Sequence, residues 1–300
     1  MPSGYLHKRC AERACEASGI TPIEHAALIL GAQGPDPLFM LGIFPLRPSS
    51  KPKPYGHLLH TTRTGAFLMA LAQRSRDRGA VERAFAMGFL THYALDSIVH
   101  PYVYAHSLDG QGRYSSLLHV RQESLWDTLY YRRDGHKGTS VSKPGISEAR
   151  PHWEAIAAVW AQAIRDVYPE TDLSEEMILT AFKGTERSNR LTHSPRGIKY
   201  GFAWAVERLL GRPMLATAQM GAPFLPREDI ENAAHALWRN PAAPDEARSE
   251  GLSDLFSMAV ARAGSLLSAA GQYFDREIDD GTFASIIGNL GYGTGIESKA

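Results

Sequence analysis

Residues 92–100 contain side chains that bind metal ions, at a spacing that brings them together. In HYALDSIVH, His92, Asp96 and His100 follow one another at steps of four residues. On an α-helix each such step moves the side chain by only about 40° around the axis, so the three form one stripe. The surrounding sequence AFAMGFLTHYALDSIV is apolar nearly all round, which predicts a buried helix. Because a buried aspartate needs a partner, the stripe indicates either a histidine–aspartate hydrogen bond in the core or a set of metal ligands.

A second predicted helix repeats this arrangement. LLHVRQESLWDTLYY places His119, Glu123 and Asp127 at the same four-residue steps, with apolar residues between them. Taken alone, this stripe could be a solvated polar face. Two histidine–carboxylate stripes on adjacent antiparallel helices, however, are how helical bundles build a metal site, and nitrogen and oxygen ligands suit zinc or a similar divalent ion.

Four further candidate residues lie at other positions in the N-terminal half. Asp36 stands between two prolines in GPDPLFM, where we expect no helix, and it is either a turn residue or a ligand. His57 and His60 both lie at the start of a predicted helix, about one helical turn apart, and either of them could be the ligand. His7 lies on the first predicted helix among charged neighbours and would be unremarkable alone.

The elements that must position these residues are predicted to be helices. Apolar residues recur at three- and four-residue spacing in many segments, and none shows a convincing strand alternation, so we expect an all-α protein. We expect a single domain over 1–300, in which 1–131 supplies the metal-site helices and 148–290 the remaining helices and pocket walls. The predicted helices lie near 5–18, 23–31, 62–76, 79–99, 115–131, 152–168, 173–183, 197–210, 228–238 and 250–271.

Composition and charge exclude several classes of protein. With 32 basic and 32 acidic residues, the chain has no net charge that would draw it as a whole to nucleic acid. Its apolar runs are too short for a membrane span, and its polar start shows no export signal, so we expect a cytoplasmic protein. Cys10 and Cys15 point away from each other on one helix and are expected to be free apolar fillers.

The order of these candidates resembles that of the zinc-dependent phospholipase C family. That family comprises all-helical bacterial enzymes whose three-zinc site is shared with fungal single-strand nucleases. The resemblance covers about residues 1–130 and is carried by H-x-x-x-D followed by H-x-x-x-E. The sequences at 58–68 and 235–244 also look like bacterial members of unassigned substrate. The motif runs through His7, Asp36, His60, His92, Asp96, His100, His119 and Glu123.

The resemblance implies a multi-helix bundle with a set of zinc ligands. One ion would be held by Asp36, His60, His92 and Asp96, and a second by His100, His119 and Glu123. A third would be bound by His7, with Asp96 as a bridge. Secreted relatives complete that third site with an N-terminal tryptophan, whereas this chain begins MPSGYLHK. The expected cofactor is therefore two or three zinc ions.

We expect a metal-dependent hydrolase of phosphoric esters. Hydrolysis of such an ester requires neutralised phosphoryl oxygens, an acidic water and a stabilised leaving group, all of which metal ions provide. Asp36 could also accept a proton from the attacking water. The expected substrate is a phospholipid or a small phosphoester. Phe39, Tyr102 and Tyr104 are candidate pocket liners, although core packing suits each of them. The alternatives are a nuclease or nucleotidase with the same metals, for which the sequence offers no nucleic-acid binding signal, and a non-catalytic, metal-stabilised helical binding protein.

Overall fold

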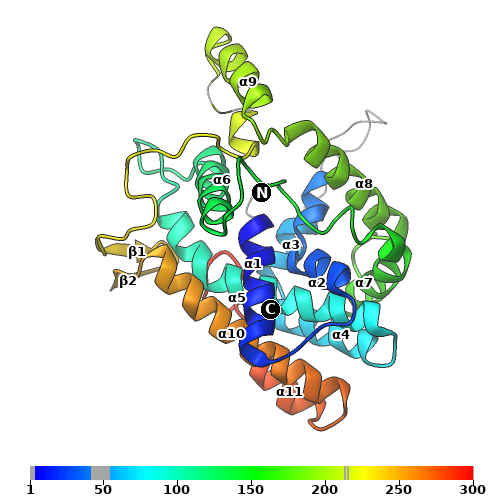
Figure 1. Ribbon diagram of the computed structural model, residues 1–300. Helices are drawn as coiled ribbons and strands as arrows, with labels where there is room; N and C mark the ends of the chain where they lie inside the picture. The colour runs from blue at the N-terminus through cyan, green and yellow to red at the C-terminus, as the bar shows by residue number, and fades with distance from the viewer. Residues whose placement is uncertain (1–3, 42–54, 213, 215, 300) are drawn as a thin grey trace.

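The computed structural model describes residues 4–41, 55–212, 214 and 216–299. It is mostly helical, which confirms the all-α prediction (Figure 1). Residues 42–54, which include most of the proline-rich sequence PLRPSSKPKPYG at 45–56, lie outside the described residues. The elements are α1 (Gly4–Ser18), α2 (His25–Ala32), the 3-10 helix η1 (Asp36–Met40), α3 (Tyr55–Thr61), α4 (Thr64–Arg76), α5 (Ala80–Ala105), α6 (Ser116–Arg133), η2 (Arg150–His152), α7 (Trp153–Val167), α8 (Glu175–Thr192), α9 (Ile198–Leu209), η3 (Thr217–Gln219), β1 (Trp238–Asn240), β2 (Ala243–Arg248), α10 (Leu252–Phe274) and α11 (Asp280–Ile287).

Helix α5 runs through the middle of the fold. It packs against α1, α2, α4, α7 and α10, and 18 of its 26 residues are buried. This is the burial expected for a helix that is apolar on nearly every side. The polar side chains of His92, Asp96 and His100 are therefore carried into the core by the packing of their apolar neighbours.

The crossing of α2 and α5 depends on two glycines. A Cβ at Gly88 would lie 2.0 Å from the carbonyl oxygen of Leu28, and one at Gly31 would lie 2.1 Å from that of Phe85. The two backbones thus touch at a place where no larger residue fits. This close contact brings the turn after α2, and with it Asp36, against the buried face of α5.

Three expectations about local structure were wrong. The predicted helix at 228–238 is a series of turns, because Asn232 and His235 have positive φ and Asp229 accepts N–H groups from two residues that follow it. Its end is β1, which pairs antiparallel with β2, so one short hairpin does exist. Asp36 begins a short 3-10 helix, which tolerates Pro37 in its first turn, where no N–H bond is required.

Two other expectations agree with the structure. Cys10 and Cys15 are both free and buried. Across the described residues, no helix is both long and apolar enough to span a bilayer.

Candidate metal centre

The three predicted ligands on α5 lie on one buried face. His92 is fully buried, and Asp96 and His100 are almost so. Asp96 Oδ2 lies 3.1 Å from His92 Nε2 and 3.2 Å from His100 Nδ1. The stripe inferred from the four-residue spacing is therefore present, and Asp96 is at its centre.

Three other elements bring further predicted ligands to Asp96. From α1, His7 Nε2 lies 3.2 Å from Asp96 Oδ1. From α3, His60 Nε2 lies 3.7 Å from Asp96 Oδ2 and 3.4 Å from Oδ1 of Asp36, which begins η1. His57 lies one turn earlier and is exposed, so that His60 is the histidine of α3 that reaches the cluster.

A second group lies beside the first, between α5 and α6. Glu123 Oε1 lies 3.1 Å from His100 Nε2 and 3.3 Å from His119 Nε2. The imidazole of His100 thus faces Asp96 with one nitrogen and Glu123 with the other. The structure brings all eight predicted ligands together, in three groups that could each hold an ion: His7, His92 and Asp96; Asp36, His60 and His92; and His100, His119 and Glu123.

Buried polar atoms without partners are concentrated in this cluster. Buried side-chain nitrogens and oxygens normally have a hydrogen-bond partner. Here Asp96 Oδ2 and His92 Nε2 have none, although they lie 3.1 Å apart, because their geometry is not that of a hydrogen bond. Converging lone pairs of this kind would be satisfied by a cation bound between them. Every predicted ligand contributes such an atom: His7 Nδ1, Asp36 Oδ1, His60 Nε2, His92 Nε2, Asp96 Oδ2, His100 Nδ1, both nitrogens of His119, and Glu123 Oε2.

Backbone carbonyls orient two of the imidazoles. His92 Nδ1 donates to the carbonyl oxygen of Ala32 at 3.1 Å, and His60 Nδ1 donates to that of Gly56 at 2.6 Å. Since Nδ1 carries the proton, Nε2 of each ring presents a lone pair to the cluster, as is usual for a metal-binding histidine. Gly34 makes room for His92, because a Cβ at this position, where φ is +53°, would lie 2.3 Å from the ring.

Lys143 is a residue of the site that the sequence did not reveal. It lies in the loop between α6 and η2, it is buried, and its ammonium contacts Asp36 Oδ2. Asn189 of α8 holds this loop, because it accepts the N–H of Lys143 at 3.0 Å and donates to its carbonyl at 2.7 Å. Lys143 thus occupies one oxygen of Asp36 and leaves the other turned towards His60.

Asp127 is the third member of the predicted stripe on α6, but it lies outside the metal groups. It accepts the N–H groups of Tyr5 and Leu6 at 3.0 and 2.9 Å. These N–H groups belong to the first turn of α1 and have no partner within that helix. Asp127 therefore fixes the start of the helix that carries His7. Burial raises the pKa of Asp127 to about 8, although the two N–H groups oppose this shift.

The three carboxylates of the cluster are held in their charged form. Burial by itself would raise the pKa of Asp36, but the Lys143 ammonium outweighs it and holds that pKa well below its usual range. Burial likewise opposes ionisation of Asp96, yet His100 and the other imidazoles keep its pKa well below normal. The pKa of Glu123 is lowered in the same way, against burial, by the adjacent imidazoles.

Two histidines of the cluster, His7 and His100, have pKa values that are shifted in opposite directions. Burial, together with the neighbouring His92, lowers the pKa of His7 to about 4, so His7 is neutral at pH 7. Burial also acts to lower the pKa of His100, but Asp96 and Glu123 outweigh it and raise that pKa well above its usual value. The cluster therefore combines three ionised carboxylates with at least one neutral imidazole, that of His7, and this combination suits a cation.

A comparison with known families is consistent with this geometry. A family model described as zinc dependent phospholipase C matches residues 6–178, which is more than half of the chain. The chain belongs to the zinc-dependent phospholipase C family. All eight predicted ligands lie within the matched range. Neither a curated protein nor a solved structure matches the chain.

The donor atoms of the cluster suit the metal of this family. Zinc prefers imidazole nitrogens, thiolates and carboxylate oxygens, and here five histidines and three carboxylates present such atoms without other partners. Both cysteines lie elsewhere, and burial raises the pKa of Cys10 to about 12, which keeps its thiol protonated. The residues present therefore fit zinc, while the role of each one as a ligand stays a prediction.

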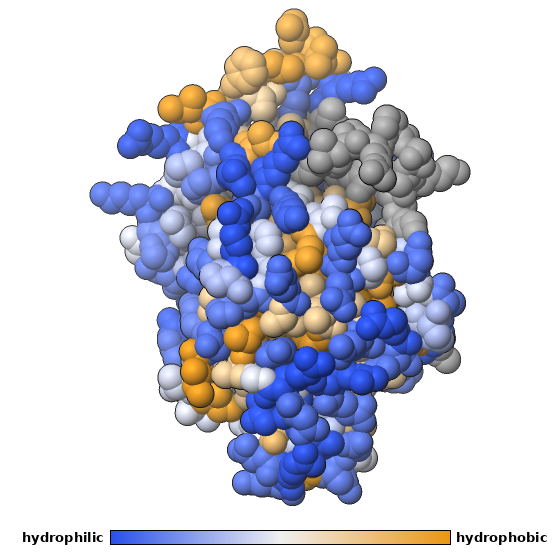
Figure 2. Space-filling model, turned by 90° about the vertical axis from the view of Figure 1, so that its right-hand side faces the viewer, coloured by the Kyte–Doolittle hydropathy of each residue, from blue (hydrophilic) through white to orange (hydrophobic). Residues whose placement is uncertain are grey.

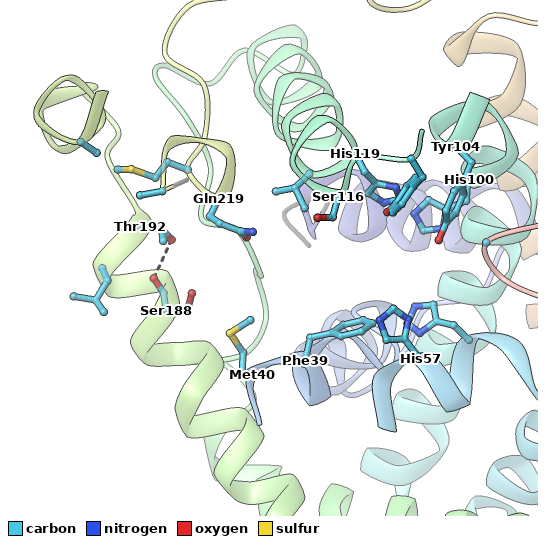
Figure 3. A pocket seen from close by; sticks show the side chains of 18 of the residues that line it. Phe39, Met40, His57, His100, Tyr104, Ser116, His119, Ser188, Thr192 and Gln219 are labelled. Carbon is cyan, nitrogen blue, oxygen red and sulfur yellow. Dashed lines mark hydrogen bonds between the residues drawn. The ribbon is translucent and has the colours of Figure 1, made fainter. Parts of the chain in front are cut away.

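A deep pocket leads to this centre (Figure 3). It encloses about 710 Å³, and three predicted ligands, His60, His100 and His119, form part of its wall. Most of the remaining wall is apolar or aromatic, including Phe39 and Tyr104. The third aromatic candidate, Tyr102, is buried against Trp126 and Trp238 and is a core residue. The other apolar or aromatic side chains of the wall are Met40, Tyr114, Val120, Leu191, Ala203, Ala216 and Met220.

Proposed function

We propose that this member of the family hydrolyses phospholipids at the phosphodiester bond that joins diacylglycerol to the phosphorylated headgroup. The observation that carries the proposal is the shape of the pocket, in which apolar walls lead directly to His60, His100 and His119. A phosphate at these histidines would leave an apolar substituent against Phe39 and Met40. Sites that bind small molecules are mostly apolar with a few placed polar groups, which is the arrangement found here.

The residues of the centre suffice for two zinc sites and part of a third. Asp36, His60, His92 and Asp96 would hold one ion. A second would be held by His100, His119 and Glu123, and the nitrogen of His7 with the second oxygen of Asp96 would contribute to a third. The resemblance suggests that the remaining ligand of the third site is at the start of the chain. Residues 1–3 lie outside the described residues.

The side chains of the centre have distinct tasks in hydrolysis. Bound zinc supplies Lewis acidity toward the phosphoryl oxygens and makes water acidic enough to attack phosphorus near neutral pH. Asp36 is ionised, and its Oδ1 has no hydrogen-bond partner, so that it can accept the proton of the attacking water. Lys143 holds the other oxygen of Asp36 and thereby aims Oδ1 at the cluster. The apolar wall orients the ester and excludes bulk water.

A nuclease with the same metals is the second candidate, and the pocket disfavours it. Its aromatic wall could stack a base, because the rings of Tyr104 and Tyr114 stack on each other with centroids 5.1 Å apart and planes inclined by 26°. A nucleic-acid strand also needs a basic groove. Among the described lining residues, Lys199 is the only lysine or arginine, and its ammonium donates to the carbonyl of Arg190.

The test uses the zinc-loaded protein and three substrates. We expect release of diacylglycerol and a phosphorylated headgroup from phosphatidylcholine in detergent micelles, slower hydrolysis of a chromogenic phosphodiester, and little cleavage of a single-stranded oligonucleotide. Glu123→Gln should abolish the first two activities, which excludes a contaminating enzyme. Faster cleavage of the oligonucleotide would favour the nuclease. Inactivity on all three with a full metal complement would favour a non-catalytic binding protein.

A further inference from the structure

Helix α9 turns its apolar face away from the protein. It forms one end of the molecule in Figure 1, and its side chains Ile198, Phe202 and Leu209 lie on one stripe and are 75%, 74% and 86% exposed. The opposite face carries Glu207, the single buried residue of the helix. A helix on the surface of a globular protein normally has the reverse orientation, with its apolar stripe on the core.

The exposed residues form one patch, which we call the α9 patch. Figure 2 shows hydrophobic residues gathered at the end of the molecule where Figure 1 places α9. Contiguous apolar patches of this kind mark binding surfaces. Phe224, which is 82% exposed, extends the patch, because its neighbour Pro223 lies beside Gly197 at the start of the helix. The α9 patch consists of Ile198, Phe202, Val206, Leu209 and Leu210, and Trp204 lies on another side of the helix.

The charge around the α9 patch is positive. Residues 191–216 contain four lysines and arginines and one acidic residue, Glu207, in a chain whose net charge is zero. Glu207 points inward, where it accepts the N–H groups of Met214 and Thr217 at 3.1 and 2.8 Å. No carboxylate of this stretch is therefore available to repel an anionic surface.

We propose that α9 lies in the surface of an anionic membrane, with the α9 patch among the lipids and the surrounding basic residues at the headgroups. Isoleucine, phenylalanine and leucine on one face of a helix, with lysine and arginine beside them, are typical of interfacial helices. A helix of 12 residues is too short to span a bilayer, so that it would lie in the plane of the surface.

The same helix connects this surface with the metal centre. Lys199 and Ala203 of α9 line the pocket whose other end is formed by His100 and His119. With α9 in the membrane, the pocket would open next to lipid, and a phospholipid could enter it without crossing water. This part of the inference rests on the proposed function, whereas membrane binding itself does not.

Vesicle binding tests the inference. We expect the zinc-loaded full chain to cosediment with vesicles of phosphatidylcholine and phosphatidylglycerol, and much less with phosphatidylcholine alone. Phe202→Ser with Leu209→Ser should reduce binding at least tenfold and leave hydrolysis of the soluble chromogenic diester unchanged, because neither residue lines the pocket. The matched control replaces two other exposed apolar residues, Ile23 (86%) and Leu237 (77%), by serine and should bind as the wild type does.

Charge and fluorescence give independent readouts. Arg196→Gln and Arg212→Gln should each weaken binding to the anionic vesicles by about fivefold, because a basic residue near such a surface contributes about 1 kcal/mol. Trp204 is half exposed, whereas the other four tryptophans are buried. Trp204 lies on a different side of α9 from Phe202, so the reporter is Phe202→Trp combined with Trp204→Phe. Lipids brominated on the acyl chain should quench the emission of this variant and leave that of Trp204→Phe alone unchanged.

Two results would overturn the inference. One is equal binding by the wild type and the Phe202→Ser, Leu209→Ser variant. The other is that the wild type binds no vesicles but forms dimers in sedimentation velocity, while the variant is monomeric. This result would assign the α9 patch to a second copy of the chain. Vesicle binding by the inactive Glu123→Gln variant separates this test from the proposed function. If the wild type binds vesicles but hydrolyses no phospholipid, the proposed function fails while membrane binding stands.

Discussion

Replacing Asp96 by asparagine would remove one negative charge from the middle of the metal centre and keep the size of the side chain. The carboxylate lies within 3.1–3.7 Å of nitrogens of His7, His60, His92 and His100. Two of the three candidate metal groups meet at this point. They have His92 in common, and Asp96 lies between their ligands. An amide can still offer an oxygen, but it cannot offer charge.

The size of the effect follows from the repulsion between neighbouring ions. Two divalent ions that share ligands lie roughly 4 Å apart, and at an effective dielectric constant of about 20 they repel by on the order of 16 kcal/mol. A carboxylate oxygen about 2 Å from each ion offsets much of this energy. We therefore expect Asp96→Asn to bind at least one zinc ion fewer per chain and to have at least a hundredfold lower affinity for that ion.

The assay combines metal analysis with thermal unfolding, each with and without added zinc. Glu207→Gln is the matched control, because Glu207 is also buried but contacts backbone N–H groups of Met214 and Thr217 and no imidazole. The control should keep its full metal content. A plain hydrogen bond between His92 and Asp96 would survive the change, since an amide oxygen still accepts. Full metal content and an unchanged melting temperature in Asp96→Asn would therefore refute the shared carboxylate.

Three further predictions concern the rest of the centre. Glu123→Gln and His119→Ala should each remove one zinc ion and leave the helical content unchanged, and unchanged metal content in both would mean that this group binds no ion. Lys143→Met should lower the free energy of unfolding of the zinc-free protein, measured by chemical denaturation, by about 3–5 kcal/mol, because Asp36 is then buried without its cation. Added zinc should restore part of this loss. Because its pKa is raised, His100 carries a proton near pH 7, and zinc must displace this proton to bind. The zinc affinity measured by titration should therefore rise about tenfold per pH unit around pH 7, with release of one proton. A zinc affinity that does not depend on pH would contradict this.

The parts of the centre that could be predicted are those with a local pattern. His92, Asp96 and His100 lie on one face of their helix, and His119 and Glu123 lie on one face of the next, because a four-residue step is close to one helical turn. The position of His7, Asp36 and His60 was inferred from the order of motifs in a known family. Local spacing alone left Asp36 as a turn residue or a ligand, and the structure places it in the cluster.

The parts that could not be predicted depend on contacts between distant segments. Lys143 meets Asp36 across 107 residues, and nothing in its surrounding loop sequence distinguishes it from a surface lysine. Asp127 continues the pattern of His119 and Glu123, yet the drift of about 40° per step carries it about 80° from His119 and towards α1. The three-member stripe on α5 has the same spread and stays within the cluster, so the difference lies in the neighbour: the end of α6 that carries Asp127 faces the start of α1.

Helix α9 shows a different limit of sequence patterns. Apolar residues at helical spacing in 197–210 predict a helix with one apolar face, but the spacing does not say whether that face meets the core or the outside. In the structure the direction is decided by Glu207, whose carboxylate binds the backbone of the segment that follows the helix and so draws the opposite face inward. A buried charge on one side of α9 thus forces the exposure of Phe202 and Leu209 on the other. The apolar patch is therefore a consequence of how the helix is anchored at the mouth of the pocket, where Lys199 and Ala203 meet the space that leads to the metal centre.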